Sequence, residues 1–281
     1  VFIGCDGCDQ ITSNWKLPLA HTRVAQVGID AELLGLSFPG CLAVLADPQA
    51  ALRQLAPLLR PRERAAWLAR ARSLKDTWTT DTEGQRASDA SPVRPERLCA
   101  ELERWLPDDA VVVADTGFAS QWTAQLLTLT SARQTYLRAV GSLGWAFPAA
   151  LGAKAALPDR PVVCVTGDGG FMYHLPELET ARRRSLNTIT VVNNNGCLGQ
   201  GQKNLGLAQL GGKPGPGMAD CYKFIQQDFA AIARSFGCLG IRVDQPSELR
   251  AALDEALRAD RPVVIDVHSE PAAVARTPWM P

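Results

Sequence analysis

The sequence lacks an excess of charge of either sign, because 29 lysine and arginine residues balance 29 aspartate and glutamate residues. A balanced chain has no long-range field that draws it to nucleic acid or to an anionic membrane, so we expect neither partner and favour a small molecule. No apolar run approaches the ~18 residues needed to cross a bilayer, and the amino terminus has no secretory signal pattern.

Cysteine and histidine are also scarce for the functions that depend on them. Eight cysteines in 281 residues are too few for a disulfide scaffold, and several lie in apolar runs, which predicts reduced thiols and a cytosolic protein. Cys5 and Cys8 form a CxxC pair, but no second pair follows at metal-ligand spacing. None of the three histidines lies in a triad-like pattern with a nucleophile.

The composition, with 46% hydrophobic and 21% charged residues, is that of a globular protein of one or two domains. Residues 1–60 read as a β, β, α pattern, in which VAQVGID and CLAVLAD are strands and Pro48 begins a helix. The chain begins abruptly with a strand-like run, which predicts further sequence upstream. Residues 61–94 pass from an arginine-rich helical stretch into DTEGQRASDASPVRP, which has no apolar period, and we expect them to be a linker.

Residues 95–281 are expected to form an α/β domain with a doubly wound parallel sheet and helices on both faces. A helix at ERLCAELERWL precedes four apolar, β-branched runs, AVVVAD, PVVCVTGD, TITVVNN and PVVIDV. Continuous apolar runs of this kind are typical of strands buried on both faces. Ligands of such sheets bind beyond the carboxyl ends of the strands, where three of these runs end in polar or glycine-bearing turns.

Two of these turns have the residues that a diphosphate bound through a metal ion requires. Asp168 offers a hard oxygen ligand, while Gly169 and Gly170 let backbone donors approach phosphate oxygens just before a helix. A GDG turn alone is more often structural. However, Asn195 follows Asp168 by 27 residues, and one helix between two strands would fill that interval and bring both turns to one sheet edge.

This pair of turns, GDGGF followed by NNNG, resembles the thiamine diphosphate signature of the acetolactate synthase, benzoylformate decarboxylase and pyruvate decarboxylase type of enzyme. The resemblance implies that Asp168 and Asn195 bind Mg²⁺ through their side chains and Cys197 through its carbonyl oxygen. If the asparagine triplet is shifted by one, Asn194 and Gly196 take those roles.

The resemblance also implies further contacts to thiamine diphosphate. The segment GSLGWAFPAALGAK is similar to the one that holds the aminopyrimidine, with Gly141 and Leu143 at the matching positions, and VVVADTGF is similar to the strand that ends against the diphosphate. The glycine-rich loop 197–222 is expected to cover the pocket, with Leu198 and Gln200 nearest the cofactor. The full set of implied cofactor-binding residues is Thr116, Gly117, Phe118, Gly141, Ser142, Leu143, Gly167, Asp168, Gly169, Gly170, Asn195, Cys197, Leu198 and Gly199.

Residues 1–60 look like the carboxyl-terminal part of the central domain of this family, which favours its decarboxylase and acetolactate synthase branch over transketolases. The glutamate that activates the cofactor in these enzymes belongs to a separate pyrimidine-binding domain with no match here. The resemblance therefore implies half an active site, no catalytic residue of its own that we can name, and a chain that is inactive alone. It also implies a homo-oligomer, a dimer or tetramer, that completes the site.

Three functions follow from these observations. The first is thiamine diphosphate- and Mg²⁺-dependent decarboxylation or carboligation of a 2-oxoacid. The second is a related lyase acting on a coenzyme A thioester of the oxalyl type, and the third is a non-catalytic cofactor-binding module. A dinucleotide module is disfavoured, because no GxGxxG follows the first strand. Acetolactate synthases hold a flavin against the central domain, and the sequence does not decide whether this chain binds FAD.

Overall fold

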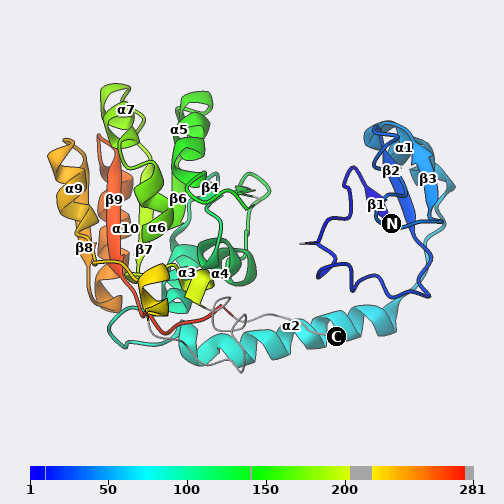
Figure 1. Cartoon of the computed structure of the whole chain (residues 1–281), viewed down its shortest axis with the longest axis horizontal. Helices are drawn as coiled ribbons and strands as arrows, with labels where there is room; N and C mark the ends of the chain where they lie inside the picture. Colours follow the sequence, from blue (N-terminus) through cyan, green and yellow to red (C-terminus); the bar gives the residue numbers. More distant parts are fainter. Residues whose placement is uncertain (10, 140, 203–216, 276–281) are drawn as a thin grey trace. The chain divides into compact units, whose positions relative to one another are not determined.

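The computed structural model describes residues 1–9, 11–139, 141–202 and 217–275, and the fold is given for those residues (Figure 1). The chain divides into two compact units, Val1–Arg72 and Ser73–Pro281. Each unit has its own parallel sheet. Among the helices of the described ranges, none is long and apolar enough to span a membrane.

The first unit is built on a three-stranded parallel sheet in the order β1-β2-β3, comprising β1 (Phe2–Ile3), β2 (Ala25–Gly28) and β3 (Leu42–Leu45). Helix α1 (Pro48–Leu55) follows β3 and leads into the 3₁₀ turn η1 (Ala56–Leu58). Asp47 begins the helix as its N-cap, since its Oδ1 accepts a hydrogen bond of 2.8 Å from Ala50 N. The β, β, α pattern expected from the sequence is present.

Helix α2 (Ala65–Arg86) is longer than the sequence pattern indicated, because it continues through the first six residues of DTEGQRASDASPVRP. Contacts within the second unit account for this extension. Trp78 packs against a buried cluster that includes Phe118 and Trp122, and Arg86 donates a 2.8 Å hydrogen bond to Leu126 O. Arg86 also forms an ion pair with Glu103. Tertiary contacts thus stabilise helix where the sequence has no apolar period.

The second unit contains a six-stranded parallel sheet in the order β5-β4-β6-β7-β9-β8. Its strands are β4 (Val111–Ala114), β5 (Thr135–Arg138), β6 (Val162–Gly167), β7 (Ile189–Asn194), β8 (Leu239–Val243) and β9 (Val263–His268). The four predicted runs form β4, β6, β7 and β9, which are buried almost throughout. The two unpredicted strands, β5 and β8, lie at the sheet edges and are partly exposed, so they lack a continuous apolar run.

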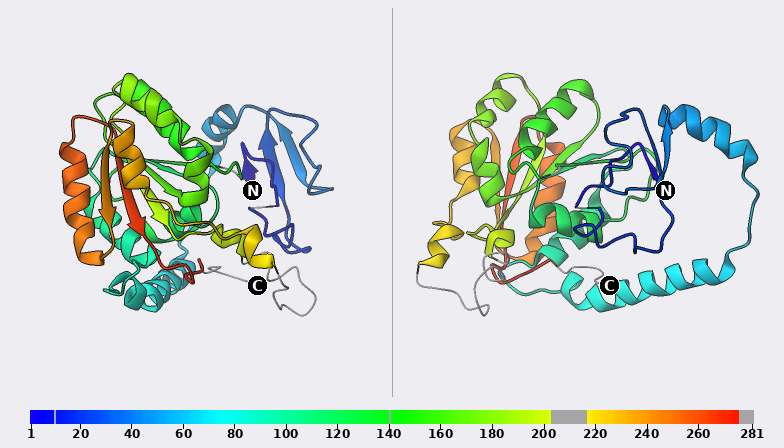
Figure 2. Two further views of the ribbon diagram at one scale, coloured as in Figure 1. Left: turned by 60° about the vertical axis from the view of Figure 1, so that its left-hand side comes forward. Right: turned by 45° about the vertical axis from the view of Figure 1, so that its right-hand side comes forward.

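Helices cover both faces of this sheet (Figure 2), so the doubly wound α/β prediction is confirmed. Helices α3 (Pro95–Trp105) and α10 (Leu249–Arg258) pack on one face. The other face is covered by α5 (Ala146–Ala156), α6 (Asp168–Tyr173), α7 (Glu177–Arg183) and α9 (Phe229–Ser235). The remaining elements are α4 (Phe118–Leu126) and the 3₁₀ turns η3 (Met218–Cys221) and η4 (Pro246–Glu248).

The strand order brings the carboxyl ends of β4, β6 and β7 side by side. Strand β4 pairs with β5 on one side and with β6 on the other, so the direction in which strands are added reverses there. This topological switch point is where open α/β sheets bind ligands. Between Asp168 and Asn195 the chain forms two short helices, α6 and α7, before β7, rather than the single helix that we expected.

Candidate functional site

A cavity lies at the carboxyl ends of β4, β6 and β7, where three turns and the start of α4 meet. All the residues predicted to bind the cofactor line it except Gly141 and Ser142. Of the residues that the prediction omitted, Trp122 lies one helical turn after Phe118, and Asn193 precedes Asn195 by two positions in an extended run. Both spacings place a side chain on the same side as a predicted residue, and this signal was available in the sequence.

Asp168 is 4% exposed and begins helix α6 directly after β6. Its Oδ1 accepts a 2.7 Å hydrogen bond from Gly169 N, and its Oδ2 accepts hydrogen bonds from Gly196 N at 2.6 Å and Cys197 N at 3.2 Å. Burial raises the pKa of this carboxyl to about 6, although the backbone donors act in the opposite direction. Asp168 thus connects the GDG turn to the asparagine turn.

The side chains of the asparagine triplet point to two different sides of the sheet. Asn195 lines the cavity, and its Oδ1 accepts a 3.2 Å hydrogen bond from Cys197 N, the same donor that reaches Asp168. Asn194 faces the α9 side, where its Nδ2 donates to Asp266 Oδ1 at 2.8 Å and to Gln227 O at 2.9 Å. The geometry therefore brings Asn195, and not Asn194, into the cavity with Asp168.

The backbone after the triplet is fixed by the segment that precedes α9. Gly196 O accepts a 2.7 Å hydrogen bond from Phe224 N, and Leu198 N donates at 2.7 Å to Tyr222 O. If the triplet were shifted by one residue, the carbonyl oxygen of Gly196 would be the metal ligand. That oxygen already accepts a hydrogen bond from a backbone N–H group. Of the predicted cover loop, residues 203–216 lie outside the described residues, while Leu198 and Gln200 both line the cavity.

Asp115 joins two further turns at the end of β4. Its carboxylate is 1% exposed and accepts hydrogen bonds from Thr116 N at 2.8 Å, Gly144 N at 3.1 Å and Thr166 Oγ1 at 2.8 Å. Burial raises the pKa of this carboxyl. Thr116 Oγ1 in turn accepts a 3.1 Å hydrogen bond from Gly141 N. Gly141 does not line the cavity, but its turn is tied to the residues that do.

Glycine is required at several of these positions because the chain comes into close contact there. A Cβ atom at Gly170 would lie 2.3 Å from Asp115 Oδ2, and one at Gly169 would lie 2.6 Å from the side chain of Leu198. At Gly117 the backbone has φ of 79°, which favours glycine. The GDGG turn therefore packs too closely for side chains while leaving backbone N–H groups near the cavity.

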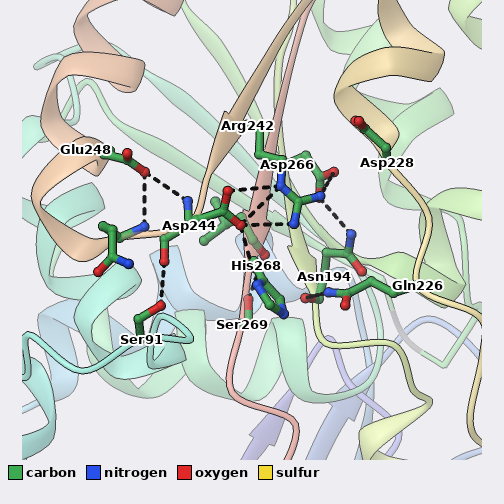
Figure 3. A network of polar contacts seen from close by, with 12 residues as sticks. Ser91, Asn194, Gln226, Asp228, Arg242, Asp244, Glu248, Asp266, His268 and Ser269 are labelled. Atoms are coloured by element: carbon green, nitrogen blue, oxygen red, sulfur yellow. Dashed lines mark hydrogen bonds and ion pairs between the residues drawn. The ribbon is translucent and has the colours of Figure 1, made fainter.

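A polar network around Asn194 connects the asparagine turn to strands β8 and β9 (Figure 3). Asp266 is 1% exposed and accepts from Asn194 Nδ2 and from Phe229 N, the latter at 2.9 Å. Arg242 Nη1 lies 3.8 Å from Asp266 Oδ2, and Arg242 Nη2 forms an ion pair with Asp244 Oδ1 at 2.9 Å. Burial raises the pKa of Asp266, whereas the Arg242 guanidinium holds the pKa of Asp244 below its usual value.

The donor set at the cavity suits a hard cation. Asp168 supplies a carboxylate and Asn195 an amide oxygen, which are ligands that Mg²⁺ prefers. Within the described part of the chain, no three histidine, cysteine, aspartate or glutamate side chains form a cluster able to hold a metal ion. A set of one carboxylate, one amide and one carbonyl needs no such cluster, so the residues present fit a cation shared with a phosphate ligand.

Comparison with known families identifies the domain that contains the cavity. Residues 115–267 match the family model described as thiamine pyrophosphate enzyme, C-terminal TPP binding domain. The match covers more than half of the chain and includes all the residues that line the cavity.

Individual relatives are similar over most of this chain. The acetolactate synthase large subunit of Parasynechococcus marenigrum is 28% identical, over 95% of this chain and 43% of that protein. Acetolactate synthase isozyme 1 large subunit of Escherichia coli is 29% identical, over 88% and 42%. Benzoylformate decarboxylase of Pseudomonas aeruginosa is 30% identical, over 66% and 34%. The chain spans less than half of the length of each of these relatives.

Proposed function

The chain belongs to the thiamine pyrophosphate enzyme family and carries its C-terminal cofactor-binding domain, and on that premise we propose that it serves Mg²⁺-dependent decarboxylation or carboligation of a 2-oxoacid. The names of its relatives, acetolactate synthase and benzoylformate decarboxylase, support a 2-oxoacid as the substrate class. Asp168, Asn195 and the carbonyl oxygen of Cys197 would hold the metal ion.

One observation carries this proposal. Asp168 from the end of β6 and Asn195 from the end of β7 accept hydrogen bonds from the same donor, Cys197 N, and both line one cavity at the switch point of the sheet. A cation bound by these oxygens would neutralise part of the charge of a diphosphate. Backbone N–H groups of the glycine turn would donate to phosphate oxygens.

The remaining residues of the site would orient the cofactor. The cofactor supplies an electron sink for the carbanion that forms when a 2-oxoacid loses carbon dioxide. Leu143 lines the cavity and would support the bent cofactor, while Gly141, held by Thr116 Oγ1, would accept from the aminopyrimidine. Phe118 and Trp122 form an apolar wall, with ring centroids 5.1 Å apart, that would exclude water from the site.

Turnover would need a further domain. No glutamate lines the cavity in the described ranges, so the group that activates the cofactor would come from a pyrimidine-binding domain, in a homo-oligomer that completes the site. We expect the 281-residue chain alone to show no decarboxylation of pyruvate, and measurable release of carbon dioxide would contradict this. All eight cysteines are free thiols, which supports a cytosolic setting.

Calorimetric titration of the chain with thiamine diphosphate, with Mg²⁺ and then with a chelator present, tests the proposal. We expect binding that requires the metal ion and is abolished in Asp168→Ala. Asp108→Ala removes a carboxylate that is 76% exposed, does not line the cavity and precedes the amino-terminal end of β4, so this control should bind like the unaltered chain. Binding that is unaffected by the chelator would refute the metal site.

A further inference from the structure

Asn193, the first asparagine of the triplet, has a buried amide oxygen that no described residue contacts through a hydrogen bond. The residue is 6% exposed, and within residues 1–9, 11–139, 141–202 and 217–275 its Oδ1 atom has no donor. A buried polar atom that stays unpaired destabilises a protein, because its hydration is lost without replacement. Most buried polar atoms of native proteins have a partner, so this one calls for a partner from outside the described residues.

The position of Asn193 indicates where that partner lies. Asn193 lines the same cavity as Asp168 and Asn195, and it pairs in register with Gly167, the residue before Asp168. Other buried atoms without partners in the described ranges include Thr190 Oγ1 and Asn194 Oδ1, but neither residue lines the cavity. The unpaired oxygen of Asn193 therefore belongs to the site.

An amide oxygen accepts hydrogen bonds and repels phosphate oxygens, so its partner must be a donor or a cation. Mg²⁺ keeps several water molecules when it is held by only a few protein oxygens. The O–H groups of such waters are strong donors because the cation polarises them.

We propose that Asn193 is a further ligand-binding residue of this site, and that its amide oxygen accepts a hydrogen bond from a water molecule bound to the divalent cation. This inference rests on the proposed function, because Asp168 and Asn195 would hold that cation. It explains why a strand position with a buried side chain carries an asparagine rather than an apolar residue.

The test compares Asn193→Leu, which replaces the amide by an apolar side chain of similar volume, with the unaltered chain. The dissociation constant for Mg²⁺, measured calorimetrically at saturating thiamine diphosphate, should rise about tenfold, the effect of losing one hydrogen bond. The melting temperature of the ligand-free variant should not fall, because the substitution removes an unpaired amide. A residue with a merely structural role would lower that temperature instead.

Two further variants keep the test decisive. Thr190→Val also removes an unpaired buried oxygen from β7, but outside the cavity, so its Mg²⁺ affinity should equal that of the unaltered chain. Asn193→Ala should show the same tenfold loss of affinity if leucine does not fit. A dissociation constant within twofold of the unaltered value in both Asn193 variants would overturn the inference alone. Absence of metal-dependent binding by the unaltered chain would refute the proposed function, and the inference with it.

Discussion

Asp168 Oδ2 lies 2.6 Å from the backbone nitrogen of Gly196, so the turn after β6 and the turn after β7 are joined through one carboxylate. This contact joins residues 28 positions apart in the sequence, and Asp168 and both neighbours of Gly196 line the cavity. The carboxylate is held by backbone donors and yet buried, and burial has the larger effect on its pKa.

The pKa of Asp168 predicts how stability depends on pH. The folded-state pKa of about 6 exceeds the ordinary value of 3.8, so between these pH values the folded protein binds more protons than the unfolded chain. The free energy of unfolding should therefore fall as pH rises from about 4 to about 6, by up to about 3 kcal/mol. Asp168→Asn should lack this component.

Urea denaturation of the unaltered chain and of Asp168→Asn at pH 4, 5, 6 and 7 measures this component as the difference between their unfolding free energies. The difference cancels the titration of the other groups. A constant difference across this range would show that Asp168 ionises normally in the folded chain.

Asn194 and Asn195 should have opposite roles despite being neighbours. Asn194→Ala removes the 2.8 Å hydrogen bond to the buried Asp266, so we expect a loss of stability of about 2 kcal/mol. Asn195→Ala should change stability little, but weaken metal-dependent binding of thiamine diphosphate, because its side chain faces the cavity. Denaturation and calorimetry on both variants check this, and the reverse result would support the shifted register.

Gly170 should not tolerate even a methyl group. The Cβ atom of Gly170→Ala would lie 2.3 Å from Asp115 Oδ2, and we expect destabilisation of about 1 to 3 kcal/mol. Gly152→Ala is the matched control, because Gly152 lies in α5 with no atom within 4 Å of the added Cβ. That variant should be stabilised by about 0.5 to 1 kcal/mol. Equal urea midpoints for the two variants would contradict the close packing.

Asp115 and Gly170 should be energetically coupled. Asp115→Ala alone leaves Thr116 N and Gly144 N without their acceptor, and we expect destabilisation of about 3 kcal/mol. In the double variant with Gly170→Ala, the added methyl group enters space that the carboxylate has left. The combined loss should be smaller than the sum by at least about 1 kcal/mol. Strict additivity would mean that the two residues do not contact each other.

Much of the fold could be predicted because its central strands have a pattern that few other structures produce. The continuous β-branched runs of β6 and β7 can be buried only between two layers of helix. The edge strands β5 and β8 were not predicted because they are only partly buried. The length of α2 was not predicted because its residues Trp78 and Arg86 are held by contacts with residues outside the helix.

The sequence by itself determined which side chains and glycines are available to the site, because the motifs GDGGF and NNNG and their spacing contain the carboxylate, the amides and the glycines. Which asparagine faces the cavity was decided by tertiary structure, because alternate residues of a strand point to opposite faces and only the sheet defines what each face meets. The buried Asp266 partners Asn194 and leaves Asn195 beside Asp168. The same alternation puts Asn193 on the side of Asn195, and the tertiary structure decides that this side meets the cavity.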